Sequence, residues 1–202
     1  MNAIRFALLL TCAVIAAAPE LAIGASQSPV PAVQTSLAKL GQGIDDVSLT
    51  NDSGHKVLWR DFAGSPRAVF FGFTNCPVVC PVTVWELDTA MIELGASADS
   101  LKIIFVTLDP ARDTPATLKA YFSGFKGRVI PLTGQEQVIQ RIAKSFDVNS
   151  EKVVTGKGSY TLDHTAAVYL LNKEGQVVDN LAFGTPRDVT VARLKKLLAG
   201  TK

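Results

Sequence analysis

The sequence has little net charge and no cluster of charges of one sign. Lysine and arginine total 20, aspartate and glutamate total 18, and the formal net charge is +2. The basic residues are scattered along the chain, so nothing favours binding to nucleic acid or to an anionic membrane surface. No internal repeat is present, and 202 residues suit one domain of ordinary size with a substantial core.

The sequence also lacks a hydrophobic run long enough to span a bilayer. The apolar stretch from Phe6 to Ala18 covers 13 residues, whereas a spanning helix needs about 20. One positive charge precedes this stretch and the small residues Ala22-Ile23-Gly24 follow it. We therefore predict a signal peptide over residues 1–24, secretion across the inner membrane and a periplasmic location. The alternatives are a membrane tether formed by the uncleaved segment and a lipid attached to Cys12.

Cysteine is scarce. Of the three cysteines, Cys12 lies in the predicted signal peptide, so the mature chain keeps Cys76 and Cys80, four residues apart. The compartment beyond the membrane is oxidising and permits a disulfide. A loop this short constrains the unfolded chain little, so a disulfide here would add little stability. A purely structural disulfide is therefore the weaker interpretation of this pair.

The order of the remaining segments predicts an α/β domain over residues 43–202, after a flexible lead over residues 25–42 that is rich in Ser, Pro, Ala and Gln. Buried strands alternate with helices between an opening and a closing β-hairpin, which indicates a central mixed β-sheet with helices on both faces. The expected strands lie at 47–49, 57–59, 67–73, 101–108, 129–132, 168–171 and 177–180, and the expected helices at 81–94, from 114, from 136 to about 146, and from 186.

Some single residues carry further predictions. Thr114 and Pro115 have the pattern of an N-cap and a first helical residue. Thr133 and Glu136 have the spacing of a capping box. Both tryptophans, at positions 59 and 85, are expected in the core.

The cysteine motif, Cys76-Pro77-Val78-Val79-Cys80-Pro81, follows a predicted buried strand and opens a predicted helix. Side chains four apart on a helical turn have Cβ atoms about 5–6 Å apart, which allows a disulfide or two sulfurs on one metal ion. The positive end of the helix dipole is expected to lower the pKa of both thiols. Geometry alone permits redox chemistry and metal binding equally.

The chain has two histidines, and they differ in context. His55 lies in a polar turn of the opening hairpin, where a solvated side chain is expected. His164 directly precedes a predicted buried strand. The strand, the cysteine motif at a helix start and the late hairpin resemble the thioredoxin plan. In that family a cis-proline faces the cysteines, and the aligned pattern puts His164 at its place.

The resemblance is sharper to the Sco/SenC family, the copper chaperones of cytochrome c oxidase assembly. It is carried by three blocks: FFGFTNCPVVCPVTV at 70–84, VTLDPARDTP at 106–115 and YTLDHTAAVYLLNKEG at 160–175. The CPxxCP motif with a distant Asp-His pair is specific, since general thioredoxins have CxxC and lack the histidine. One departure is Val78, where the family often has Asp.

This resemblance implies that Cys76, Cys80 and His164 bind one copper ion per chain, as Cu(I) or Cu(II), and that the cysteines form a disulfide when oxidised. Two thiolates and an imidazole suit Cu(I), and no fourth ligand for a structural zinc site is evident. Asp163 is expected either to accept a hydrogen bond from the imidazole or to act as an ordinary turn residue. A site with the apolar Val78 is expected to favour Cu(I).

The block from Asp109 to Thr114 follows a buried strand and is expected at the same sheet edge as the cysteines. Arg112 is expected to pair with a carboxylate there, and the block has either a structural or a partner-docking role.

Three functions fit these observations. The first is a metallochaperone, not an enzyme, that delivers copper to a respiratory cytochrome c oxidase subunit, with other copper carriers or thiol reductants as further partners. The second is a thiol–disulfide oxidoreductase that keeps the cysteines of a copper-receiving client reduced, a role compatible with the first. The third, a thioredoxin-like peroxidase, is disfavoured because such enzymes have Thr three residues before the cysteine, whereas Thr74 lies two before Cys76.

Overall fold

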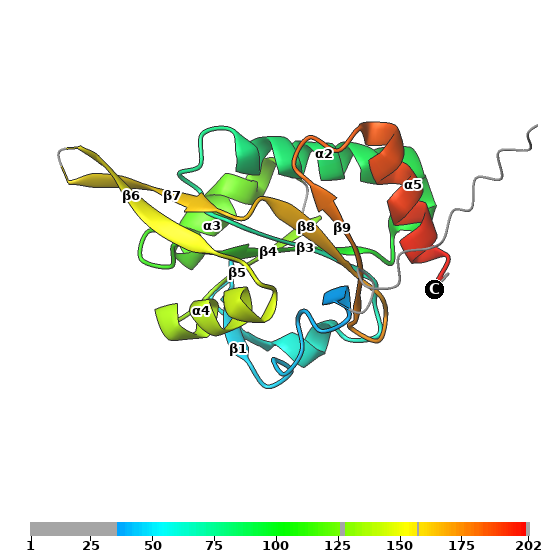
Figure 1. Ribbon diagram of the computed structural model, residues 1–202, viewed down its shortest axis with the longest axis horizontal. Coiled ribbons are helices and arrows are strands. Elements are labelled where there is room, and N and C mark those ends of the chain that lie inside the picture. The colour runs from blue at the N-terminus through cyan, green and yellow to red at the C-terminus, as the bar shows by residue number, and fades with distance from the viewer. Residues whose placement is uncertain (1–35, 126–127, 157, 201–202) are drawn as a thin grey trace, which may run out of the picture.

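The computed structural model describes residues 36–125, 128–156 and 158–200, which form a central sheet covered by helices on both faces (Figure 1). The sheet has seven strands in the order β2-β1-β5-β4-β3-β8-β9. Its members are β1 (Ser48–Asn51), β2 (Lys56–Leu58), β3 (Arg67–Gly72), β4 (Lys102–Thr107), β5 (Val129–Thr133), β8 (Ala167–Leu171) and β9 (Val177–Ala182).

The middle of the sheet is parallel and its borders are antiparallel. β3 pairs with β4, and β4 with β5, in parallel, whereas β1 and β8 run antiparallel to their neighbours. β3 is buried at every position, which explains why its sequence is a continuous apolar run rather than an alternating one. The predicted mixed sheet and the added N-terminal hairpin, β1–β2, are confirmed.

Helices α2 (Val79–Leu94), α3 (Pro115–Phe122) and α5 (Arg187–Leu198) pack on one face of the sheet. Helix α4 (Glu136–Ser145) and the 3₁₀ turn η1 (Trp59–Phe62) cover the other. Figure 1 shows these two layers above and below the sheet. The predicted thioredoxin-like α/β arrangement, with helices on both faces, is therefore observed.

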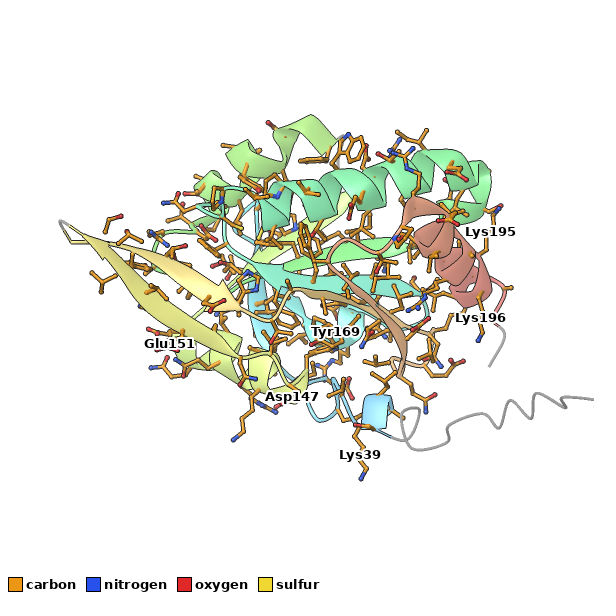
Figure 2. The ribbon with its side chains drawn as sticks, turned by 45° about the horizontal axis from the view of Figure 1, so that its top comes forward. Lys39, Asp147, Glu151, Tyr169, Lys195 and Lys196 are labelled. Atoms are coloured by element: carbon orange, nitrogen blue, oxygen red, sulfur yellow. The ribbon has the colours of Figure 1, made fainter. Side chains whose placement is uncertain are left out.

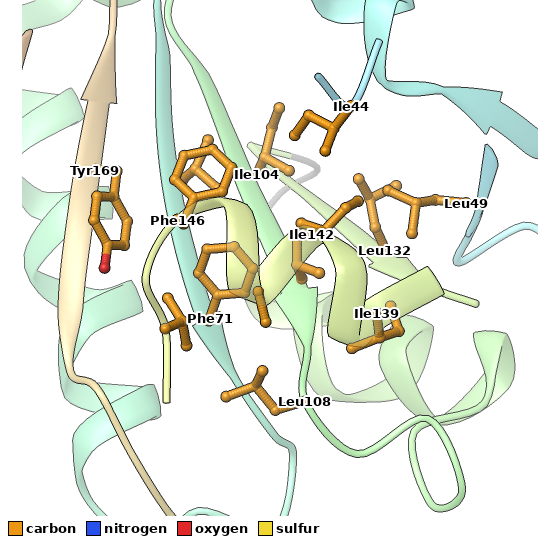
Figure 3. Packing of buried hydrophobic residues seen from close by; sticks show 14 of the residues in the cluster. Ile44, Leu49, Phe71, Ile104, Leu108, Leu132, Ile139, Ile142, Phe146 and Tyr169 are labelled. Carbon is orange, nitrogen blue, oxygen red and sulfur yellow. The ribbon is translucent and has the colours of Figure 1, made fainter. Parts of the chain in front are cut away.

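The α4 side of the core is built on aromatic rings (Figure 3). The Phe146 ring lies 5.3 Å from that of Phe71 and 5.2 Å from that of Tyr169, measured between centroids. Trp59 joins this group at 5.8 Å and is 2% exposed, as predicted. Edge-to-face and tilted contacts of this kind stabilise a core beyond the area they bury.

The prediction that Trp85 is a core residue is wrong, since its side chain is 56% exposed. Helix α2 buries Val84 and Leu87, which fixes the face that meets the sheet. Successive side chains of a helix are about 100° apart around its axis, so Trp85, which follows Val84, points away from that face. Its ring instead contacts the guanidinium of Arg187, 5.4 Å from the ring centroid.

The helix starts agree with the sequence only in part. Thr114 caps α3, accepting a hydrogen bond from the Thr117 amide at 3.2 Å, as predicted. The predicted capping box of α4 is wrong, because Thr133 is the last residue of β5 and the N-cap, Gln135, makes no side-chain capping bond. Helix α2 begins at Val79, two residues before the predicted start.

A third hairpin was not predicted from the sequence. Strands β6 (Ser150–Gly156) and β7 (Ser159–His164) pair antiparallel in a separate two-stranded sheet. This hairpin projects from the body of the protein (Figure 1, yellow, left). Every residue of β6 is exposed, so the strand shows no alternation of apolar and polar residues by which it could be recognised. Figure 2 shows Glu151 on its outer surface.

The start of the chain is described only from residue 36. The predicted signal peptide, Cys12 and most of the predicted lead lie outside the described residues. The described end of that lead packs on the domain: Leu37 and Leu40 contact the α4-side core, and the Gly41 amide donates to the Ser145 carbonyl. None of the helices in the described part of the chain has both the length and the apolar character needed to cross a membrane.

Candidate metal centre

The two cysteines lie where β3 gives way to α2. The Cys76 amide donates to the Phe73 carbonyl at 3.2 Å, which closes a turn after the strand. The Cys80 amide, in the first helical turn, lies 3.4 Å from the Cys76 sulfur and donates to it. Both side chains are buried free thiols. The Cys76 sulfur therefore sits at the positive end of α2, as the motif predicts.

Gly72, at the end of β3, makes room for the Cys80 sulfur. A Cβ atom added at Gly72 would lie 2.5 Å from Cys80 Sγ and 3.1 Å from the Phe105 ring. The sulfur therefore packs directly on the strand backbone. This glycine is not among the residues predicted for the site, although a glycine inside a buried apolar strand is a signal of such close approach.

Burial dominates the acidity of the inner cysteine. It raises the pKa of the Cys80 thiol to about 12, and the nearby charges of Cys76 and Asp113 act in the same direction. A hydrogen bond with the Phe73 backbone opposes this rise only in part. The predicted lowering of the pKa is therefore wrong for Cys80, because desolvation outweighs the favourable helix terminus.

His164 is the last residue of β7, and its ring packs edge-on against Phe73 with the centroids 5.8 Å apart. Its Nδ1 lies 3.0 Å from the Thr165 carbonyl oxygen. A carbonyl oxygen only accepts, so Nδ1 carries the proton and Nε2 keeps its lone pair free for a metal ion. The Asp163 side chain is exposed, and no hydrogen bond joins it to the ring among the described residues, so the bond between Asp163 and the imidazole stays a prediction.

Cys80 and His164 line the same cavity of about 30 Å³. Its other walls are mainly apolar, and the volume has room for one ion or one water molecule. Among the described residues, no three His, Cys, Asp or Glu side chains are near enough to one another to hold a metal ion. The structure thus brings the two cysteines together and places His164 at the cavity that Cys80 lines, without bringing all three side chains within the reach of one metal ion.

The other histidine, His55, has the surroundings of an ordinary surface residue. His55 is exposed in the turn between β1 and β2, where its amide donates to the Asn51 side chain at 2.9 Å. The predicted solvated turn is confirmed.

Comparison with known proteins points to one family. The SCO1/SenC family profile matches residues 40–199. Protein sco1 of Schizosaccharomyces pombe is 33% identical over 136 residues, which are 65% of this chain and 52% of that protein. The protein SCO2 homolog, mitochondrial, of Danio rerio is 30% identical over 146 residues, 71% of this chain and 52% of its own length. The chain spans about half the length of these relatives.

Two solved structures with copper bound share the fold. ScoI of Bradyrhizobium japonicum superposes with a TM-score of 0.69 at 36% identity, covering 75% of this chain and 96% of that one. Yeast Sco1 gives a TM-score of 0.69 at 29% identity, covering 77% and 88%. The family profile spans most of the chain, and the chain therefore belongs to the SCO1/SenC family.

Proposed function

We propose that this protein is a copper carrier that serves the assembly of a respiratory cytochrome c oxidase, with Cys76, Cys80 and His164 as its copper ligands. The observation that carries the proposal is the shared cavity: a buried thiol at the start of α2 faces the same space as an imidazole at the end of β7. The copper-bound relatives support copper as the metal.

The donor set suits the task. Two thiolates and one imidazole are soft ligands that favour Cu(I). Nε2 of His164 is free because Nδ1 is bonded to the Thr165 carbonyl. Three ligands leave a coordination position open, so a ligand of the receiving protein can enter before the first thiolate leaves. We propose the copper-receiving subunit of the oxidase as that partner and the periplasm as the place of transfer, the predicted signal peptide being the basis for the location.

A Cu(I) titration tests the ligand set. The reduced protein is titrated against a coloured Cu(I) chelator, and we expect one ion per chain. Cys76→Ser, Cys80→Ser and His164→Ala should each weaken binding, because each removes one of three ligands. His55→Ala is the matched control and should bind like the wild type. If His55→Ala lost copper and His164→Ala kept it, the assignment would be wrong.

A thiol–disulfide oxidoreductase is the second candidate, favoured by one observation. Both cysteines are free, and the Cys76 sulfur lies 3.4 Å from the Cys80 amide, so the two residues are already adjacent. Disulfide formation would remove both thiolate ligands, so the oxidised carrier should take up no Cu(I) until it is reduced. His164→Ala separates the two functions: a carrier loses copper and keeps thiol exchange, whereas an oxidoreductase keeps efficient turnover of a disulfide substrate and has no use for copper.

A further inference from the structure

A buried charged segment after β4 holds the loop that carries the cysteines. Asp113 is 1% exposed and accepts three hydrogen bonds. Two come from Thr74, its amide at 3.1 Å and its hydroxyl at 2.5 Å, and the third comes from the Thr107 hydroxyl at 2.6 Å. Thr74 lies two residues before Cys76. The carboxylate therefore fixes the approach to the cysteine motif.

The same segment also holds the hairpin that carries the histidine. Asp109 is 2% exposed, forms an ion pair with Arg112 and accepts a hydrogen bond from the Tyr160 hydroxyl at 2.8 Å. Arg112 donates through Nη1 to the Tyr160 carbonyl at 2.9 Å and stacks on the Tyr160 ring at 3.8 Å. Tyr160 lies four residues before His164 on β7. The hydroxyl, the carbonyl and the ring of Tyr160 therefore all contact Asp109 or Arg112.

Contacts to the Phe73 ring connect the cysteine loop with the hairpin that carries the histidine. The Arg112 guanidinium lies 6.0 Å from the Phe73 ring, and that ring packs against His164. Phe73 belongs to the turn that leads to Cys76. The segment that contains Asp109, Arg112 and Asp113, here called the charged clamp, therefore touches both parts of the candidate site.

The β6–β7 hairpin has few buried residues of its own to fix its position on the protein. Strand β6 is exposed along its whole length, and Leu162 is the buried residue of β7. A two-stranded hairpin is marginally stable without further packing. The position of His164 therefore depends on how Tyr160 and Leu162 attach β7 to the body.

We propose that Asp109, Arg112 and Asp113 are positioning residues that hold the His164 segment and the cysteine loop in a fixed relation before copper binds. This inference rests on the proposed function. Holding both ligand segments before the ion arrives lowers the ordering cost of binding. The roles are divided: Asp113 acts through the cysteine loop, and Asp109 with Arg112 acts through the histidine hairpin.

The division of roles gives a sharp test in the full chain. Tyr160→Phe removes only the hydroxyl that bonds to Asp109. We expect it to weaken Cu(I) binding about tenfold, the order of one hydrogen bond to a charged group. In a His164→Ala background the same change should have no further effect, because the residue through which it acts is gone. Thr74→Val, which removes the hydroxyl bonded to Asp113, should weaken binding in both backgrounds.

A matched control exists on the other side of the protein. Arg193 makes the same two kinds of contact as Arg112, an ion pair to Asp179 at 3.1 Å and a hydrogen bond to the Asn180 carbonyl at 2.6 Å. Arg112→Lys keeps the charge and loses the forked geometry, so it should weaken copper binding, whereas Arg193→Lys should not. Thermal melts confirm that each variant is folded, and Tyr160→Phe alone still decides the matter if Arg112→Lys fails to fold.

A spectroscopic readout separates alignment from general loosening. In the Cu(II) form, electron paramagnetic resonance should show weaker nitrogen coupling from the imidazole in Tyr160→Phe and unchanged coupling in Arg193→Lys. The inference is overturned if Tyr160→Phe binds copper as the wild type does, binds it more tightly, or weakens binding equally with and without His164. Failure of the wild type to bind copper would instead refute the proposed function.

Discussion

Replacing Gly72 by alanine tests whether the position of the Cys80 sulfur is set by the backbone of β3. The change adds one methyl group to a strand residue that is fully buried. That methyl would lie 2.5 Å from Cys80 Sγ, whereas ordinary contacts begin at 3.4 Å. The sulfur, together with the first turn of α2, must therefore move by about 1 Å, several times the tolerance of about 0.2 Å in metal–ligand distances.

The magnitude follows from packing. Inserting a methyl group into a filled core destabilises the fold by about 1–3 kcal/mol. The second contact, at 3.1 Å from the Phe105 ring, leaves little room to relax on the other side. Phe105 is itself fully buried and packs on Phe70 at 5.1 Å between centroids. We therefore expect the free energy of unfolding to fall by an amount in the upper half of that range. The free energy of copper binding should fall by a larger fraction of its own value, because a metal bond is more directional than packing.

The assay combines urea unfolding of the reduced protein with Cu(I) competition. Gly134→Ala is the matched control, since its added methyl would meet Leu49 at an ordinary 3.5 Å and the residue directly follows β5 of the same sheet. The control should keep both stability and copper affinity. A Gly72→Ala protein that binds copper with wild-type affinity would refute the reasoning, because it would show that the sulfur position does not matter or that the strand yields freely.

Three further predictions concern single side chains. Burial is the largest cause of the raised pKa of Cys80 and remains when Cys76 is replaced, so in Cys76→Ser iodoacetamide should react with Cys80 more slowly than with free cysteine at pH 8. Mass spectrometry follows the rate, and equal rates would contradict the burial argument. Trp59→Ala should lower the free energy of unfolding by about 3–5 kcal/mol, whereas Trp85→Ala should change it by about 0.5 kcal/mol or less. Similar losses for the two variants in urea titrations would refute the buried position of Trp59 and the exposed position of Trp85. Val78 is 57% exposed at the N-cap of α2, so Val78→Asp should raise Cu(II) affinity more than Cu(I) affinity; equal shifts in paired titrations would show that residue 78 does not tune the metal.

The sheet was predictable because its strands carry strong local signals. β3 and β4 are continuous apolar runs, and turn residues separate the terminal hairpins. The site was predictable because cysteine and histidine are rare in this chain, so the spacing of Cys76 and Cys80 stands out. The place of His164 came from a family resemblance, since no local pattern links residues 84 positions apart.

Other features depend on tertiary structure that a sequence pattern does not contain. The exposed strand β6 has no buried face and so no periodic signal. Asp113 lies in a block for which the sequence predicts a structural or a docking role without naming its partners, and its three bonds to Thr74 and Thr107 arise only when β3 and β4 lie side by side. The direction of the Cys80 pKa shift likewise required the burial of the sulfur to be known, because helix position alone predicts the opposite sign.

X-ray absorption spectroscopy of the Cu(I)-loaded protein identifies the copper ligands by element and distance. We expect a copper ion bound by two sulfurs at about 2.3 Å and one nitrogen at about 2.0 Å, with distances in the range of other thiolate and imidazole metal sites. His164→Ala should lose the nitrogen and keep the sulfurs, while His55→Ala should leave the spectrum unchanged. A shell without sulfur in the wild type, or a nitrogen that persists in His164→Ala, would contradict the assignment of Cys76, Cys80 and His164 as the copper ligands.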